Sequence, residues 1–287
     1  MKAYYSDGRG RYGTGESYDY FWQYEDEPVE ICTSSDGLWT YTETGEKISL
    51  LRYNGNQIHI DIPGVVNGKK TVSLECTFDG FYELKSVTVP EGIITISGGF
   101  YGCEGLETVS LPGSIRDLEH AFECCYSLKT LVLPPDAKYF DYAFSGTRIE
   151  TMEFPEGAED ISHSFIESQY LKSVFIPKSV TALYEAFEDC ETLEHVVIEE
   201  GVTSIDDYAF FHCLSLKELV IPKSVVQFGE KCVGYMEIRE YLPPDRSAYR
   251  MKGEQIIPGF KIKGVRGSAA ERYAEENGIT FEAVTDN

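Results

Sequence analysis

The chain has 287 residues, 42% of them hydrophobic, and carries a formal net charge of −23 at pH 7. This hydrophobic content is ordinary for a folded protein and excludes wholesale disorder. The acidic balance excludes DNA and RNA as expected partners, because both require clustered Lys and Arg, and leaves open a solvated acidic surface or an acidic face for a basic partner.

The first 36 residues are rich in Tyr, Gly and acidic residues. Residues 8–13 match the pattern G-x-G-x-x-G, which binds dinucleotides only when a buried strand precedes it and a helix follows it. Here a short polar segment precedes the pattern and more glycine follows, so we expect no dinucleotide site and no cofactor. We expect the aromatic residues between Tyr18 and Tyr24 to cover the open end of the fold; the alternative is a small-ligand or enzymatic role for this segment.

The start of the chain shows no membrane or export signal. No run of apolar residues approaches the roughly 20 needed to span a bilayer, so we expect no membrane insertion. Residues 1–7 do not lead into the apolar core of a signal peptide. As given, the chain is expected in the cytoplasm; the alternative is a secreted or cell-surface protein whose signal was removed.

Residues 37–62 read as a β-hairpin cap. Two strand-like runs, residues 38–42 and 48–53, flank a turn that contains Gly45. Residues 58–62 then alternate apolar and polar side chains. The first repeat of a solenoid exposes its apolar interior unless an element caps it, and the hairpin is well placed to do so.

Residues 63–235 are repetitive. Strand-like segments with apolar residues at the first, fourth and sixth positions, and in all but one of them proline at the seventh, begin at residues 84, 106, 128, 149, 171, 193 and 216. Their spacing of 21 to 23 residues, with a leucine-spaced strand in each unit, indicates a leucine-rich-repeat solenoid.

Each repeat also contains a turn with a phenylalanine and, three residues later, a small polar side chain. The phenylalanines are Phe100, Phe122, Phe144, Phe165, Phe187 and Phe210, and the small residues are Cys103, Cys125, Thr147, Ser168, Cys190 and Cys213. Because Thr and Ser replace Cys at this position in two repeats, we expect the cysteines to be buried, reduced thiols that bond a backbone carbonyl. Unpaired thiols mildly favour a reducing compartment. No C-x-x-C pair or His cluster is present, so we expect no metal site.

The outward positions of the repeat strands carry the candidate binding residues. The fifth position turns apolar toward the end of the series, with Val132, Phe175, Val197 and Val220, interrupted by Glu153. His195 and Glu218 stand two positions before Val197 and Val220. A contiguous apolar patch with a polar rim indicates a partner-binding surface, whereas exposed strands also favour Val and Phe for their β-propensity alone. His195 has no third group to complete an acid–base mechanism, so we expect a surface histidine.

The repeat pattern decays after Pro222. Residues 236–260 fit no repeat and are expected to form an irregular insertion with several basic residues. In residues 261–287, Ser268 can cap a helix from Ala269 to Glu276, and Glu271 stands at the capping-box position. The sequence thus divides into residues 1–36, 37–62, 63–235, 236–260 and 261–287.

The strand motif, the Ala-Phe-x-x-Cys turn and the closing residues 264–281 together resemble the BspA-like leucine-rich-repeat family, also described as the Treponema pallidum type. The resemblance covers about residues 37–283. It implies a right-handed solenoid with a parallel concave β-sheet and irregular or 3₁₀ convex turns. It also implies an interaction role, typically on bacterial surfaces, and the family has no shared catalytic residues to carry over.

We therefore predict a monomeric, non-enzymatic module, adhesin-like or a scaffold, that binds a protein partner through its concave face. The alternatives are an enzymatic or small-ligand role of the N-terminal Gly/Tyr segment and a purely structural spacer.

Overall fold

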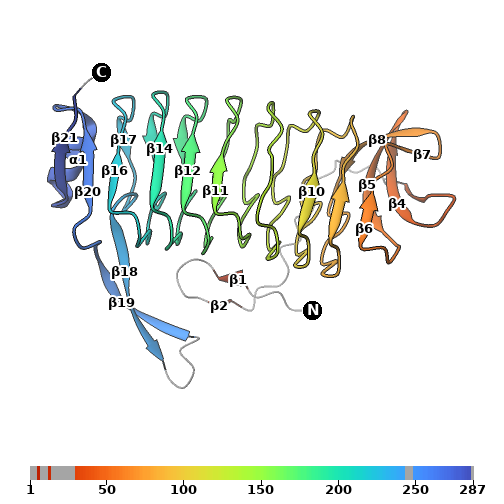
Figure 1. Cartoon of the computed structure of the whole chain (residues 1–287), viewed down its shortest axis with the longest axis horizontal. Helices are drawn as coiled ribbons and strands as arrows, with labels where there is room; N and C mark the ends of the chain where they lie inside the picture. Colours follow the sequence, from red (N-terminus) through yellow and green to blue (C-terminus); the bar gives the residue numbers. More distant parts are fainter. Residues whose placement is uncertain (1–4, 7–11, 14–29, 243–247, 286–287) are drawn as a thin grey trace.

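The computed structural model describes residues 5–6, 12–13, 30–242 and 248–285. The chain winds into an elongated, right-handed β-solenoid of about ten turns, with little helix (Figure 1). The predicted fold class is confirmed. The aromatic cluster between Tyr18 and Tyr24 lies outside the described residues, as does most of the glycine pattern at residues 8–13.

One strand from most turns contributes to the concave face. These strands are β6 (His59–Asp61), β9 (Ser86–Thr88), β10 (Thr108–Ser110), β11 (Thr151–Glu153), β12 (Ser173–Ile176), β14 (His195–Ile198), β16 (Glu218–Val220), β20 (Lys261–Gly264) and β21 (Thr280–Ala283). All pairs between them are parallel. The hydrogen-bonded groups are β6-β9-β10, β11-β12-β14 and β16-β20-β21. The concave ladder therefore extends beyond the predicted repeats at both ends.

The concave sheet is interrupted at the third repeat, where the sequence predicts a strand over residues 128–134 and none forms. The following turn explains the interruption on one side. The interval from Phe144 to Ile149 is one residue shorter than the interval from Phe122 to Leu128. The backbone N–H of Arg148 consequently donates to the Leu128 carbonyl at 2.8 Å, one position early. The two strands therefore leave parallel register.

A second parallel ladder joins the turns. Its strands are β13 (Ala182–Leu183), β15 (Ser204–Ile205) and β17 (Gln227–Phe228). Single parallel bridges continue it through the earlier repeats, linking Ser73, Thr95, Asp117, Tyr139 and Asp160 in sequence. Each turn is thus held at more than one point, so the third repeat keeps its place although its concave strand is lost.

The repeat phenylalanines form one buried column along the solenoid axis. Neighbouring ring centroids lie 5.1–6.4 Å apart, a separation typical of favourable aromatic packing. The column begins one repeat earlier than the sequence predicts, at Phe78, which is 2% exposed.

The small polar residues of the turn bond to the column's backbone, as predicted. The four cysteines of this set each donate from Sγ to the carbonyl of the preceding repeat's phenylalanine, as between Cys103 and Phe78 at 3.2 Å. Thr147 and Ser168 both donate to the Phe144 carbonyl. All eight cysteines fall within the described residues, and each is a free thiol.

The backbone takes the left-handed conformation on both sides of each column phenylalanine. Two residues before it, φ lies between 45° and 60°, and two residues after it between 57° and 75°. Non-glycine residues rarely adopt this region, and Asn, Asp and glycine tolerate it best. The residues found there include His120, Tyr142, His163, Glu185 and Asp189. The tight turn therefore dictates side-chain direction at two positions of every repeat.

The N-terminal cap is a five-stranded sheet. Its strand order is β3 (Ile31–Thr33), β4 (Trp39–Thr44), β5 (Lys47–Tyr53), β8 (Lys69–Leu74) and β7 (Val65–Val66). The predicted hairpin is present as β4 and β5. A separate antiparallel pair joins β1 (Tyr5–Ser6) to β2 (Tyr12–Gly13).

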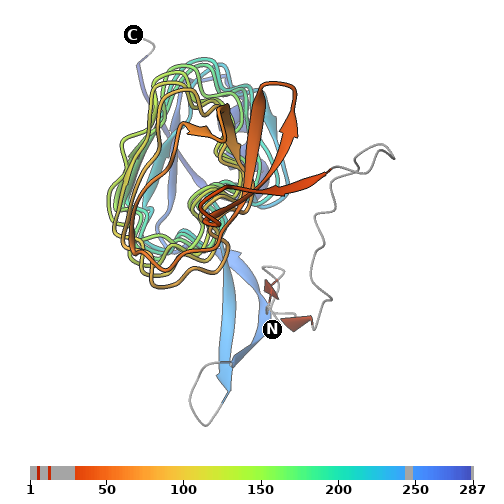
Figure 2. The ribbon, with the colours of Figure 1, turned by 90° about the vertical axis from the view of Figure 1, so that its right-hand side faces the viewer.

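The prediction of an irregular segment at residues 236–260 is wrong. Strands β18 (Tyr235–Leu242) and β19 (Ala248–Ile256) pair antiparallel and project from the solenoid as a hairpin (Figures 1 and 2). Alternating apolar and polar residues favour strands here, whereas the Pro-Pro pair at residues 243–244 suggests a break. The prolines follow the first strand instead of interrupting it.

The C-terminal cap contains the predicted helix, α1 (Ala269–Asn277). The Ser268 hydroxyl accepts a hydrogen bond from the Glu271 N–H, and Gly278 ends the helix with φ 68°. Strands β20 and β21 on either side of the helix continue the concave ladder. The cap therefore closes the core while extending the sheet.

Gly201, on the turn that follows β14, provides a test of this geometry. Its φ is 145°, and a Cβ there would lie 2.3 Å from the Lys178 carbonyl oxygen. Gly201→Ala should lower the free energy of unfolding by roughly 2–4 kcal/mol, because it adds a backbone clash to a strained φ. The control, Gly113→Ala, places its Cβ 3.8 Å from the nearest side-chain atom and should change stability by less than about 0.5 kcal/mol. Denaturant unfolding measures the stability of both variants, and equal stability would contradict the close approach of Gly201 to the Lys178 carbonyl.

The thiols provide a second test. Burial raises the pKa of Cys103 to about 12 and also raises the pKa values of Cys125, Cys190 and Cys213. Because the thiolate is the reactive form, these four should resist iodoacetamide in the folded state, while the exposed Cys76 is alkylated first. Peptide mass spectrometry of a labelling time course distinguishes the sites. Rapid native labelling of the four, or a disulfide among them, would show that they are not interior residues.

Candidate functional site

The fifth positions of the central concave strands form an aligned outward column. Glu153, Phe175 and Val197 are direct partners across β11, β12 and β14. The flanking residues Val174 and Ile176 are buried, whereas Phe175 is half-buried and lies outside the core. The strand therefore presents Phe175 outward, as the sequence predicts.

The two remaining predicted valines, Val220 and Val132, differ in whether they extend this column. Val197 is 54% exposed, and Val220 on the next concave strand, β16, is 48% exposed. Val132 is 87% exposed but lies in the interrupted third repeat, outside any strand. The structure thus pairs Phe175 with Val197 in one sheet, places Val220 on the next concave strand, and leaves Val132 outside any strand.

The predicted rim residues lie beside the apolar column. His195 pairs with Ser173 across β12 and β14, and its side chain is 76% exposed, with Nε2 3.9 Å from Glu194. Glu218 pairs with Lys261, and Lys263 Nζ lies 2.8 Å from Glu218 Oε1. The hydrogen bond from Lys263 is the main cause that lowers the pKa of Glu218.

Lys261 and Lys263 are rim residues that the sequence interpretation misses. They alternate with Ile262, which is buried, so their outward direction is readable from the sequence. Their position beside Val220 is not, because the hairpin of β18 and β19 separates the two strands along the chain.

Opposite charges at the second strand positions form ion pairs along part of the concave face. Lys85 pairs with Glu107 at 2.9 Å, and Lys172 pairs with Glu150 at 2.8 Å. These pairs are well exposed to solvent, so each contributes little to stability. Their regularity suits strand register better than recognition.

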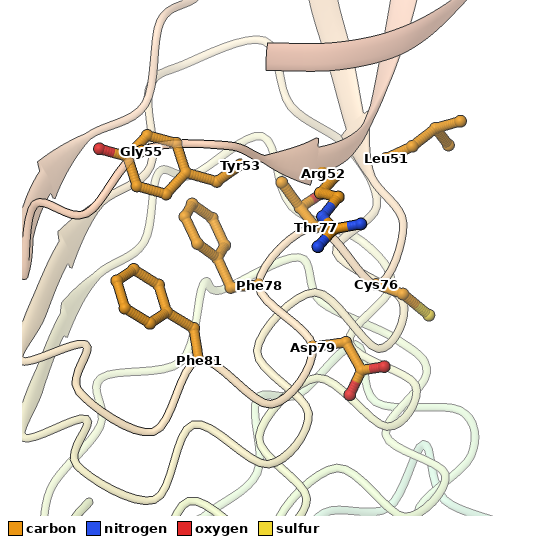
Figure 3. A pocket seen from close by; sticks show the side chains of 9 residues that line it. All are labelled: Leu51, Arg52, Tyr53, Gly55, Cys76, Thr77, Phe78, Asp79 and Phe81. Atoms are coloured by element: carbon orange, nitrogen blue, oxygen red, sulfur yellow. The ribbon is translucent and has the colours of Figure 1, made fainter. Parts of the chain in front are cut away.

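Two clefts lie away from the apolar column. One of about 540 Å³ is lined by Glu107, Ser127, Lys129, Thr130 and Arg148 at the interrupted third repeat. The other, of about 560 Å³, lies near the N-terminal cap, with Tyr53, Phe78 and Phe81 on one side and Cys76 and Asp79 on the other (Figure 3). Burial raises the pKa of Cys76 and Asp79. A thiol with a raised pKa is a poor nucleophile at neutral pH, so this cleft does not suggest covalent chemistry.

An ionic cluster fixes the base of the projecting hairpin. Arg239 on β18 contacts Asp189, Glu191 at 3.1 Å and Glu237 at 2.7 Å. His212 Nδ1 accepts the backbone N–H of Glu237 at 2.9 Å. Breaking such a buried arrangement is costly because it leaves charges unpaired. The hairpin is therefore joined at its base to the two turns that follow Phe187 and Phe210.

The same cluster contains the one group of potential metal ligands found among the described residues, Asp189, Glu191 and His212. The Arg239 guanidinium contacts both carboxylates. A divalent cation would have to displace this guanidinium, so the donors suit an internal ion pair better than a metal.

Within the described part of the chain, no helix has the length and apolar character needed to cross a bilayer.

Comparison with known proteins identifies the repeat. The sequence profile described as "BspA type Leucine rich repeat region" matches residues 70–185 and 184–245, in six copies. A search of curated protein sequences returned no match.

Two solved structures show the same fold. A leucine-rich repeat protein of T. pallidum is 23% identical, with a TM-score of 0.52 over 71% of this chain and 86% of that one. A leucine-rich repeat protein of Bacteroides ovatus is 19% identical, with a TM-score of 0.63 over 91% of this chain and 67% of that one. At these identities the likeness extends to the fold alone.

Proposed function

The chain belongs to the BspA-type leucine-rich repeat family, and from this premise we propose that it is a non-enzymatic module that binds a protein partner on the concave face of its solenoid. Proteins of this repeat class serve generally as interaction scaffolds. The observation that carries the proposal is the alignment of Phe175 and Val197 across β12 and β14, with Val220 on the next concave strand.

The chemistry of this column fits an interface. Interfaces combine an apolar centre, often with an aromatic anchor, and a polar rim that excludes water around it. Phe175 supplies the aromatic ring, and Val197 and Val220 widen the apolar centre. Because the repeats stack in register, these side chains form one contiguous exposed apolar patch, and such patches are typical of interaction sites.

The surrounding groups favour a partner with mixed polarity. Glu153 ends the apolar column on one side, and Lys263 pairs with Val220 at the other. His195 and Glu218 lie on the adjacent outward column. A partner therefore meets apolar atoms at the centre, a carboxylate at one end and an ammonium group at the other. Such charges set orientation and specificity more than affinity.

The same groups give little support for catalysis. His195 is highly exposed, and its ion-pair contact, to Glu194, is long at 3.9 Å. General acid–base catalysis works best with a positioned pair whose pKa values are tuned by burial or by close neighbours. His195 is exposed and its ion-pair contact is long, so we assign it to the rim.

The proposal predicts the effect of removing the anchor. With a partner isolated from the native organism on the intact chain, Phe175→Ala should weaken binding by about 1–3 kcal/mol, because the ring supplies buried contact area. Surface plasmon resonance or calorimetry of the purified pair measures the loss.

Two variants serve as controls. Thr108→Ala, at the opposite end of the concave face, should leave affinity unchanged. Phe187→Ala removes a fully buried column ring and should cost about 3–5 kcal/mol of folding stability. If Phe175→Ala binds normally, the concave column is not the interface. If it destabilises the fold as much as Phe187→Ala does, the ring belongs to the core.

A further inference from the structure

The concave sheet is open at the third repeat, between β10 and β11 (Figure 1). Strand β10 pairs with β9 and β11 pairs with β12, so each leaves one edge toward residues 129–133. Among the described residues, the backbone of residues 129–133 takes part in no hydrogen bond. Exposed strand edges with unpaired N–H and C=O groups are templates for pairing with another chain. The gap therefore leaves a run of backbone donors and acceptors open on the concave face.

Lys129 is a cation of the charge ladder without an acid of its own. In the ladder it stands between Glu107 and Glu150. Each of these carboxylates is already paired with another lysine, at 2.9 Å from Lys85 and at 2.8 Å from Lys172. Within the described chain, the ammonium group of Lys129 forms no ion pair and no hydrogen bond. Two neutral pairs thus flank an uncompensated positive charge.

Arg148 brings a second positive charge to the same place. It precedes the fourth repeat strand, at a position that carries no basic residue in the other six repeats, which have Glu83, Gly105, Ser127, Tyr170, Thr192 and Ser215 there. Its guanidinium carbon lies 5.3 Å from the centre of the Tyr170 ring, a cation–π contact that holds the group in place. In the part of the chain that the structure describes, this guanidinium donates no hydrogen bond. Its fork of N–H groups is therefore available to a carboxylate.

Both cations line one cleft of about 540 Å³, together with Glu107, Ser127 and Thr130. Because Glu107 is paired with Lys85, the cleft offers two positive charges and two hydroxyl groups to a ligand. This combination suits an anion. The cleft also lies beside the open backbone that begins at residue 129, which a small anion would leave unused. A peptide with an acidic side chain uses both features.

We propose that this third-repeat cleft binds an extended acidic segment of a protein partner. Lys129 and Arg148 hold a glutamate or aspartate side chain of the segment, and its backbone pairs along residues 129–133. Val132, which is 87% exposed on this stretch, adds an apolar contact. The site does not depend on the column of Phe175, because its residues belong to the second, third and fourth repeats.

An acidic peptide tests the site in the full-length chain. The probe is a fluorescein-labelled octapeptide of alternating glutamate and threonine, and the control peptide has glutamine in place of glutamate. Fluorescence anisotropy at pH 7 and physiological salt measures the affinity of each. Because the chain has a net charge of −23, diffuse electrostatics oppose the glutamate peptide, so its binding reports a local cationic site. We expect the glutamate peptide to bind about tenfold or more tightly than the glutamine peptide.

Three variants locate the site. Lys129→Gln and Arg148→Gln should each weaken the glutamate peptide about tenfold, as expected for a charge-assisted hydrogen bond. The matched control is Lys217→Gln, which removes the same charge from the same strand position of the seventh repeat, where Lys217 donates to the Leu214 carbonyl at 2.7 Å. It should change affinity less than about twofold. All three side chains are exposed, so thermal unfolding should give the parent's midpoint for each variant.

Hydrogen exchange separates backbone pairing from a contact of charges alone. With the glutamate peptide at saturation, the amides of residues 129–133 should exchange about tenfold or more slowly than in the free chain, because they become hydrogen-bonded. The proposal is overturned if the glutamate peptide does not bind, if the glutamine peptide binds equally well, or if Lys217→Gln weakens binding as much as Lys129→Gln. It is also overturned if the bound peptide leaves the exchange of residues 129–133 unchanged.

Discussion

The structure depends on the contact between successive phenylalanine turns. Each column ring stacks on its neighbours, and the backbone of the same residue is bonded on both sides. The Phe122 N–H, for example, donates to the Ala143 carbonyl of the next repeat, and the Phe100 carbonyl accepts the Cys125 thiol. Each column phenylalanine therefore buries its ring and also satisfies its backbone hydrogen bonds, so neighbouring repeats have little freedom to shift in register. The small residue before each phenylalanine follows from the same constraint, since a Cβ at Gly99 would approach the Leu74 Cβ to 3.3 Å.

This arrangement leaves the concave face free to vary. The strand over residues 128–134 is lost where the turn is one residue short, yet Phe144 keeps its ring contacts with Phe122 and Phe165. Outward side chains on the concave strands contribute little to the column, so they can serve recognition. The acidic residues beside the phenylalanine turns can also vary, although their left-handed backbone fixes the direction of each side chain.

The sequence predicts the features that recur in every repeat, and it does not predict the features that occur once. The column and its thiols are readable because each position is seen six times, and their hydrogen bonds follow from the exchange of Cys with Ser and Thr. Phe78 escapes the pattern because Thr77 precedes it and Phe81 takes the place of the small polar residue. The hairpin of β18 and β19 has no second copy to compare. The interrupted strand keeps apolar residues at its first, fourth and sixth positions, so its own sequence does not show the interruption, and the short turn that follows accounts for one side of it. The ionic cluster joins Arg239 to Asp189, 50 residues away in the chain, a pairing that no local pattern indicates.

Native-state amide hydrogen exchange tests most directly whether the turns hold the repeats together. The account predicts that the amides of Phe100, Phe122 and Phe144 exchange among the slowest in the chain, because their hydrogen bonds are buried between stacked repeats. Residues 129–133 of the third repeat should exchange much faster than the amides of β12. The account is contradicted if the Phe122 and Phe144 amides exchange as fast as residues 129–133, since the lost concave strand would then have loosened the column itself.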